Sequence, residues 1–214
     1  MTNVSKRVEA GRNTMKITIL YDNNALPGFE SGWGFSCLVE NGQRILFDTG
    51  DDGRKLIHNF EQANIDPKSV DKVVLSHNHW DHVDGLEGFQ KFNCEAEVVH
   101  PSDFSEPTEI SPGVYTTGAL GLLPKEQSLV AETEKGNIVI TGCAHPGLEK
   151  ILRVAGTLGR IYGVLGGFHG FSEFEKLEGI QLIAPCHCTQ YTEQIKQKFP
   201  APFKQIKAGS VIEM

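Results

Sequence analysis

Three histidines and one aspartate fall within six consecutive residues, directly after an apolar run at 73–75. Residues 77–82 read HNHWDH, and imidazole and carboxylate groups are common zinc ligands. His77 and His79 are two residues apart, so on an extended segment both rings leave the same side, as two ligands of one ion must. Asp81 and His82 lie beyond the point where the chain must turn, and they can face a second ion. The spacing therefore predicts a site for two metal ions.

The alternative interpretation is a polar loop that happens to be rich in histidine, because histidine is often a surface residue or a satisfied core residue. The chain has eight histidines in 214 residues, so a single one would carry no argument. Four ligand-type side chains in six positions are much less expected by chance, and they favour the metal interpretation.

Three further histidines follow apolar runs that we expect to be strands. His145, His169 and His187 each come shortly after such a run, where Gly, Pro or Cys interrupts it. Such breaks let the backbone approach an ion or a ligand closely. We expect His145 and His187 to be metal ligands, and His169 to bind substrate or transfer a proton. For each of them the alternative is a hydrogen-bonded histidine at a strand end.

Asp48 is a carboxylate at the end of another apolar run, at 45–47. It can cap the following helix or close a turn. It can also hold a ligating imidazole by accepting a hydrogen bond from its ring N–H, and the two roles are compatible. We assign no role to His100, which follows a predicted strand, or to His58, which lies in a polar segment with helical spacing.

These residues need a fold that brings the ends of several strands together. Asn41-Gly42 between two apolar runs predicts a hairpin near the start of the chain. Strand-like and helix-like segments then alternate, and loops after such strands converge on one edge of a sheet, so two sheets between helix layers fit the pattern. We expect strands at 16–21, 35–40, 44–47, 72–76, 96–100, 128–133, 137–141, 161–165, 181–185 and 203–206, and helices at 52–63, 85–92, 148–158 and 189–199.

Length and composition limit what the chain can be. With 214 residues, 39% of them hydrophobic, the chain can bury a substantial core, and we expect a single domain at 15–214 after a disordered extension at 1–14. The formal charge of −7 argues against nucleic-acid and membrane partners, which need clustered Lys and Arg, and favours a small-molecule substrate. No apolar run approaches the roughly 20 residues that span a bilayer. Because the start also lacks the apolar centre of a signal peptide, we expect a cytoplasmic location.

The five cysteines are an odd number without a paired spacing pattern, which suits reduced thiols better than a disulfide framework. Residues 186–188 read CHC, but a structural zinc site usually needs a second ligand pair, which is missing here. Thiols near a metal site can also form a redox-sensitive switch. The cysteines are Cys37, Cys94, Cys143, Cys186 and Cys188.

Residues 77–82 resemble the His-x-His-x-Asp-His motif of the metallo-β-lactamase superfamily. The resemblance extends over nearly the whole chain from Lys16, and Asp48 matches the Asp of that family's early Asp-Thr-Gly. It implies an α/β fold, a four-layered αβ/βα sandwich with the metal site along one edge. Residues 141–147, 166–169 and 185–189 resemble a subgroup of metal-dependent hydrolases related to dihydropterin ribofuranosyl-aminobenzene phosphate synthase.

One segment departs from the wider family pattern. Many members have a ligand histidine in a Gly-His-Thr turn and a bridging Asp after a later strand, whereas residues 115–118 contain no histidine. His145 then completes the first metal site. Cys143 falls near the expected place of the bridging Asp, and the sequence leaves open whether it is a ligand. Flavodiiron relatives carry Glu where this chain has His79, so the histidine favours zinc.

The resemblance and the ligand pattern predict a hydrolase that uses two Zn²⁺ ions, with Mn²⁺ or Fe²⁺ as alternatives. Zinc lowers the pKa of bound water to about 7 in favourable sites, which suits attack on an ester, thioester, lactone or phosphodiester. Asp81 would also orient the nucleophile, and His169 would act as a general acid or contact an oxyanion. The alternatives are a synthase or transferase for a phosphorylated pterin-like substrate and a non-enzymatic metal or redox sensor. The expected ligand sets are His77, His79 and His145 for one ion, and Asp81, His82 and His187 for the other.

Overall fold

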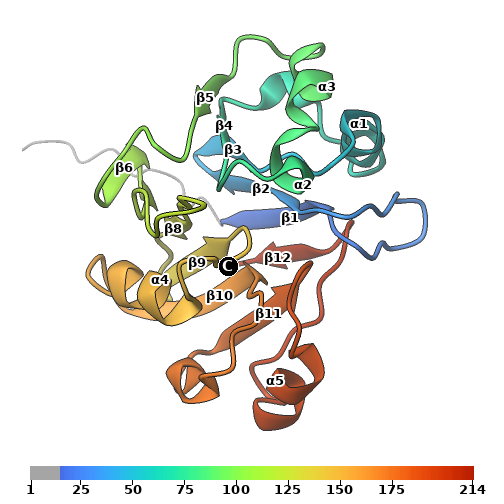
Figure 1. The fold of residues 1–214 in the computed structure, drawn as a ribbon. Coiled ribbons are helices and arrows are strands. Elements are labelled where there is room, and N and C mark those ends of the chain that lie inside the picture. Colours follow the sequence, from blue (N-terminus) through green and yellow to red (C-terminus); the bar gives the residue numbers. More distant parts are fainter. Residues whose placement is uncertain (1–14) are drawn as a thin grey trace, which may run out of the picture.

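The computed structural model describes residues 15–214, and the extension expected at 1–14 lies outside the described residues. Two six-stranded sheets form the centre of the molecule, and helices cover their outer faces (Figure 1). The sheet orders are β12-β1-β2-β3-β4-β5 and β11-β10-β9-β8-β7-β6. This is the four-layered α/β sandwich that the sequence predicts.

In the first sheet, β2 and β3 form the hairpin predicted from Asn41-Gly42, and β4 and β5 continue the sheet in parallel. The helices α1 and α3 pack their apolar sides on its outer face, where Leu56 and Phe60 contact Leu38 and Leu46 within one buried cluster. The elements are β1 (Lys16–Tyr21), β2 (Ser36–Asn41), β3 (Gln43–Phe47), α1 (Gly53–Gln62), η1 (Pro67–Ser69), β4 (Lys72–Val74), α2 (Trp80–Val83), α3 (Leu86–Gln90), β5 (Glu97–Val99) and β12 (Val211–Glu213).

In the second sheet, β9, β10 and β11 are parallel, whereas β6, β7 and β8 add in antiparallel order. The helices α4 and α5 lie on its outer face, where Leu148, Ile151 and Ile195 join the buried cluster around Val139 and Val164. The elements are β6 (Thr108–Ser111), β7 (Val114–Thr116), β8 (Leu129–Ala131), β9 (Asn137–Thr141), α4 (Leu148–Ala155), β10 (Ile161–Gly167), η2 (Phe174–Leu177), β11 (Leu182–Cys186) and α5 (Thr192–Lys198).

The main core lies between the two sheets, where alternate residues of facing strands interdigitate. Phe35, Phe47, Ile140 and Leu165 belong to this cluster and are fully buried. Burial of such apolar surface contributes about 25 cal/mol per Å², so the sandwich fixes the strand ends against each other. Within residues 15–214, every helix is too short or too polar to cross a membrane.

The helix expected at 85–92 is confirmed as α3, but one predicted strand was wrong and several short elements were not predicted. The short helix α2 precedes α3 and is one of the unpredicted elements. The strand expected at 203–206 is absent from this part of the described chain, where only Phe203 forms an isolated bridge, to Ile183. The terminal strand is instead β12, which pairs with β1 and places Ile212 opposite Ile17. The hairpin of β6 and β7 was not predicted, because its strands are short and partly polar.

Candidate metal centre

The residues that the sequence marks for chemistry lie in loops that follow parallel strands. Asp48 follows β3, His77 follows β4, His145 follows β9, His169 follows β10 and His187 follows β11. Parallel strands in the two sheets end on the same side, and the sandwich brings these loops together.

The backbone of these loops adopts unusual conformations. Five non-glycine residues within 15–214 have positive φ, and four of them lie in the site loops: Asp48, Ala144, His169 and His187. Positive φ costs free energy for such residues and often occurs at functional sites. The surrounding packing therefore holds these loops in conformations that the chain would not otherwise prefer.

His77, His79 and His145 form one cluster of imidazoles. His77 Nε2 lies 3.0 Å from His79 Nδ1, and His145 Nε2 lies 3.2 Å from the same His79 nitrogen. One ring nitrogen from each residue lies within 4.8 Å of the other two. These are the three residues expected to hold the first ion, and the fold brings them together.

Asp81, His82 and His187 form a second cluster beside the first. Asp81 Oδ2 lies 3.3 Å from His187 Nε2 and 3.8 Å from His82 Nε2. The rings of His77 and His82, which belong to different clusters, have centroids 4.3 Å apart. The two expected ligand sets are therefore adjacent, which is the arrangement that a binuclear centre needs.

The outer nitrogens of three imidazoles are anchored by the protein. Ser76 Oγ lies 2.8 Å from His77 Nδ1, Asp48 Oδ2 lies 2.7 Å from His82 Nδ1, and Asn23 Oδ1 lies 3.1 Å from His187 Nδ1. Such contacts fix the tautomer and the orientation of a ligating ring. They leave the opposite nitrogen of each ring directed into the clusters, and Asp48 lies where the sequence expects it to support a histidine.

The residues fit a pair of metal ions on two observations. Ligands of a tetrahedral zinc ion, at about 2.0–2.2 Å from it, lie about 3.3–3.6 Å apart, close to the separations within both clusters. Among residues 15–214, His187 Nε2 is one of the few buried side-chain nitrogens without a well-formed hydrogen bond, although Asp81 Oδ2 lies 3.3 Å away. The His187 side chain is fully buried, and an orphaned nitrogen of this kind costs free energy unless an unseen partner binds it. The donor set of imidazoles and a carboxylate is the one that zinc accepts.

The electrostatics keep most of these donors in the protonation state that metals bind. Burial, together with neighbouring imidazoles, lowers the pKa of His82 to about 3 and that of His145 to about 4. Although burial alone would raise the pKa of Asp81, the imidazoles of His187 and His82 lower it to about 2. At neutral pH the two histidines are therefore neutral and Asp81 is ionised, as metal ligation requires.

Glu126 supports the site, and the sequence analysis missed it. This side chain is 1% exposed, and its Oε1 accepts hydrogen bonds from the backbone N–H groups of Cys143 and Ala144, at 2.9 and 2.8 Å. Its Oε2 accepts from the N–H of His145 at 2.8 Å. Burial raises the pKa of Glu126 to about 7, against the effect of these three donors. No local pattern around residue 126 indicates this role, because all its partners lie 17–19 residues away.

We expect Glu126→Gln to weaken metal binding at the clusters by about 10- to 100-fold, the range seen when groups that orient metal ligands are changed. The amide offers only one acceptor oxygen, so at least one of the three loop N–H groups loses its partner, which costs about 1–3 kcal/mol. Competition with a chromophoric chelator measures the affinity. The exposed Glu134 provides the control Glu134→Gln, and equal affinities in the two variants would contradict this role of Glu126.

His169 lies beside the first cluster but outside it. Its ring centroid is 5.0 Å from that of His145, and the residue is exposed, whereas its neighbours Phe168 and Phe171 are buried. This exposure does not fit a role for His169 in simple core packing beside these phenylalanines. His169 and His145 line a cavity of about 280 Å³, so the imidazole faces a space that a ligand can enter.

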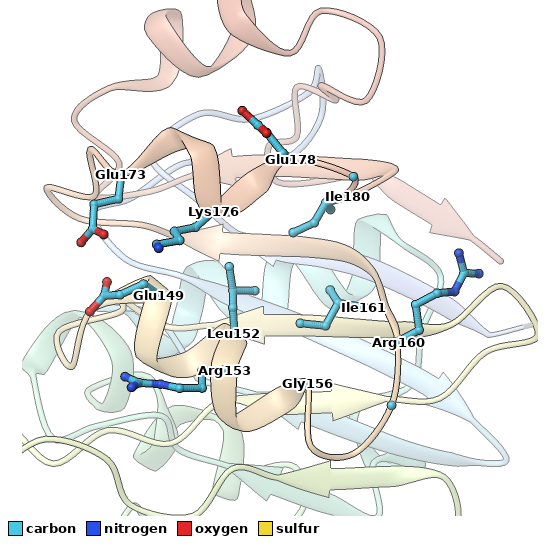
Figure 2. Close-up of a pocket in the computed structure, with 12 residues that line it drawn as sticks. Glu149, Leu152, Arg153, Gly156, Arg160, Ile161, Glu173, Lys176, Glu178 and Ile180 are labelled. Carbon is cyan, nitrogen blue, oxygen red and sulfur yellow. The ribbon is translucent and has the colours of Figure 1, made fainter.

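A larger cavity of about 730 Å³ continues along α4 and η2 (Figure 2). It shares Glu149 and Glu173 with the smaller cavity next to His169. Its floor contains Leu152, Ile161 and Ile180, and Figure 2 shows charged side chains from both elements along its rim. The cavity leads away from the histidine clusters, so a ligand longer than the inner cavity would extend along this groove.

The other candidates lie apart from the clusters. His58 Nε2 lies 3.0 Å from the carbonyl oxygen of Gly28, and His100 lines a different cavity near Asn78. Trp33 is 53% exposed, and its ring lies 5.6 Å from that of His187. Trp33 therefore lies against the second cluster.

Comparisons with known proteins agree with this geometry. Residues 34–149 match the family model of the metallo-beta-lactamase superfamily. The chain is 28% identical, over 86% of its length and 91% of the relative, to 7,8-dihydropterin-6-methyl-4-(beta-D-ribofuranosyl)-aminobenzene-5'-phosphate synthase from Methanocaldococcus jannaschii. A similar solved structure is that of Tm1679, described as a metal-dependent hydrolase of the beta-lactamase superfamily. The two sequences are 26% identical and the TM-score is 0.79, and the match covers 94% of this chain and 99% of that chain. The structure of the metallo-beta-lactamase fold protein YhfI from Bacillus subtilis superposes with a TM-score of 0.68, and the match covers 94% of this chain and 100% of that chain. Because the two sequences are only 14% identical, this similarity concerns the fold alone. The family model spans more than half of the 214 residues, and the chain belongs to the metallo-β-lactamase superfamily.

Proposed function

We propose that this protein is a hydrolase with two zinc ions, acting on an ester, thioester, lactone or phosphodiester of a small molecule. The observation that carries the proposal is the pair of adjacent clusters, each with three ligand atoms within 4.8 Å of one another. His77, His79 and His145 would hold one ion, and Asp81, His82 and His187 the other. The similarity to Tm1679, described as a metal-dependent hydrolase, supports the same reaction class.

The ions and the side chains would contribute to different parts of the reaction. Zinc bound in the two clusters would lower the pKa of a water nucleophile and polarise the carbonyl or phosphoryl group under attack. Asp81 is ionised at neutral pH, because its pKa is lowered to about 2 by His187 and His82 against the effect of burial. Its carboxylate can therefore accept a hydrogen bond from the attacking water and orient it.

His169 would act on the leaving group or on developing negative charge. It borders the cavity of about 280 Å³ that also contains His145, and it belongs to neither three-residue cluster. An imidazole in that place can donate a proton to the leaving group or a hydrogen bond to an oxyanion. Both contributions need the ring near the substrate rather than bound to an ion.

We expect His169→Ala to keep the full metal content while kcat falls by about 10²- to 10⁴-fold, the usual contribution of a positioned acid or base. Elemental analysis gives the metals per chain, and steady-state kinetics on the best substrate gives kcat. His58→Ala serves as the control, because His58 belongs to neither ligand cluster and its Nε2 lies 3.0 Å from the Gly28 carbonyl oxygen. Unchanged kcat in His169→Ala would remove this residue from the mechanism.

The substrate class can be tested with a panel of simple phosphodiesters, thioesters and lactones. The zinc-loaded protein is expected to hydrolyse at least one of them, and treatment with a chelator should abolish that turnover. Added zinc should then restore it. If the zinc-loaded protein converts none of them, the hydrolase proposal fails.

A second candidate function is synthase or transferase chemistry on a phosphorylated pterin-like substrate. It is favoured by the similarity to the Methanocaldococcus jannaschii synthase, which extends over 86% of this chain. The same ligand clusters would then activate a group other than water. A dedicated synthase should convert none of the simple phosphodiesters, thioesters or lactones, so the same panel separates the two functions.

A further inference from the structure

Cys143 lies where the two ligand clusters meet. Its Sγ is 3.2 Å from His82 Nε2, close to the about 3.5 Å that separates a nitrogen and a sulfur ligand on one tetrahedral zinc ion. The same sulfur lies within 4.8 Å of ligand nitrogens of both His77 and His82, which belong to different clusters. The Cys143 sulfur also lies within 4.8 Å of ligand atoms of His187 and Cys188. Cys143 is thus within reach of both clusters.

The loop around Cys143 is built to hold this sulfur in place. A Cβ atom at Gly142 would lie 2.2 Å from Ser76 Oγ and 3.2 Å from Asp48 Oδ2, so only glycine allows the end of β9 to approach these residues. The N–H of Cys143 donates to Glu126 Oε1 at 2.9 Å. Two separate contacts therefore fix the position of the residue against His82.

The surroundings of Cys143 differ from those of a cysteine that only fills a core. Cys37 is fully buried in the apolar cluster between the sheets, where a thiol behaves as a small hydrophobic group. Cys143 is also buried, at 4% exposure, but its sulfur lies near the imidazoles of His77, His82 and His187 and near the Cys188 thiol. A sulfur donor with several imidazole nitrogens within 4.8 Å has the neighbours of a metal ligand.

We propose that Cys143 is a thiolate ligand of the metal centre, on the side where the two clusters meet. The proposal rests on the binuclear site proposed above and adds a seventh protein ligand to its six. On binding, the S–H bond breaks, the proton passes to solvent and a sulfur–metal bond forms, with no change of oxidation state. Thiolate together with imidazole is a donor set that suits Zn²⁺ and Co²⁺.

Cobalt substitution tests this ligand directly. The chelator-treated protein is loaded with Co²⁺, and its absorption spectrum is recorded together with the cobalt content per chain. A thiolate bound to Co²⁺ produces an intense charge-transfer band in the near ultraviolet, whereas imidazole and carboxylate ligands do not. We expect the band in the unmodified protein and in Cys188→Ala and Cys37→Ala, and its loss in Cys143→Ser and Cys143→Ala.

A zinc competition measurement provides a second readout on the same variants. Cys143→Ala should weaken binding of one ion by about 10- to 100-fold, as for other changes around metal ligands, and circular dichroism confirms that the variant is folded. A protein that binds two cobalt ions without the band, or a band that persists in Cys143→Ala, overturns the proposal. A protein that binds no cobalt at all contradicts the binuclear centre itself, and the two failures are therefore distinguishable.

Discussion

Asp48→Ala should lower the free energy of unfolding of the metal-free protein by about 3–5 kcal/mol, the cost of removing one partner from a buried polar pair. The Asp48 carboxylate is fully buried. It accepts hydrogen bonds from the Ser76 N–H at 2.6 Å and the Ser76 hydroxyl at 2.7 Å, and it lies 2.7 Å from His82 Nδ1. Alanine leaves these groups without a partner in a region closed to water, and each orphaned group costs about 1–3 kcal/mol. Urea denaturation in the presence of chelator measures the difference.

Asp52 provides a matched carboxylate four residues further along the same loop. Its side chain caps α1 by accepting from the Arg54 N–H at 2.8 Å, and it is partly exposed. Removing a cap of this kind costs about 1 kcal/mol, so Asp52→Ala should destabilise the protein much less than Asp48→Ala. Asp48 also has a φ of 57°, which Asn tolerates better than Ala, and Asp48→Asn should therefore lose less stability than Asp48→Ala. Equal losses for Asp48→Ala and Asp52→Ala would mean that the buried network does not stabilise the fold.

Burial also shifts the pKa values of Asp48 and of its partner His82. Burial raises the pKa of Asp48 to about 8, against the hydrogen bonds from Ser76, while burial lowers the pKa of His82 to about 3. Both shifts have the same cause, since burial disfavours the charged form of each group. When the neutral imidazole carries its ring proton on Nδ1 and donates it to Asp48 Oδ2, the Nε2 atom of His82 is free to bind an ion.

The sequence was sufficient to predict the fold class and the grouping of the candidate ligands. Each of His145, His169 and His187 follows an apolar run, and parallel strands that end on one side bring the loops after them together. The separation of His169 from the two clusters was also predictable, since the six other residues already complete two sets of three. These inferences used local patterns, a rule about sheet edges and the resemblance to the metallo-β-lactamase superfamily.

The supporting groups could not be predicted in this way. Glu126 and Asn23 act through hydrogen bonds to residues 19 and 164 positions away, respectively, and nothing next to them in the chain indicates a buried polar role. The terminal strand was misplaced for a related reason. β12 has only three residues, and its pairing with β1 depends on the packing of Ile212 in the core between the sheets, which no local pattern reveals.

Removing one histidine from either cluster should halve the metal content and abolish most of the activity. We expect two zinc ions per chain in the unmodified protein and one in each of His79→Ala and His187→Ala, because each variant leaves the other cluster intact. A metal ion supplies several kcal/mol of transition-state stabilisation, and each 1.36 kcal/mol corresponds to a tenfold change in rate. The activity of both variants should therefore fall by at least about 10³-fold.

Elemental analysis of protein purified without added metal or chelator gives the metal content, and His100→Ala is the matched control. His100 is exposed and lines a cavity apart from both clusters, so this variant should keep two ions and full activity. Two ions in His79→Ala or His187→Ala would contradict the assignment of that residue as a ligand. Loss of both ions from either single variant would instead mean that the two clusters bind their ions cooperatively. Such cooperativity is expected if Cys143 joins the clusters. Adding Cys143→Ala to that single variant would then cause no further loss of metal.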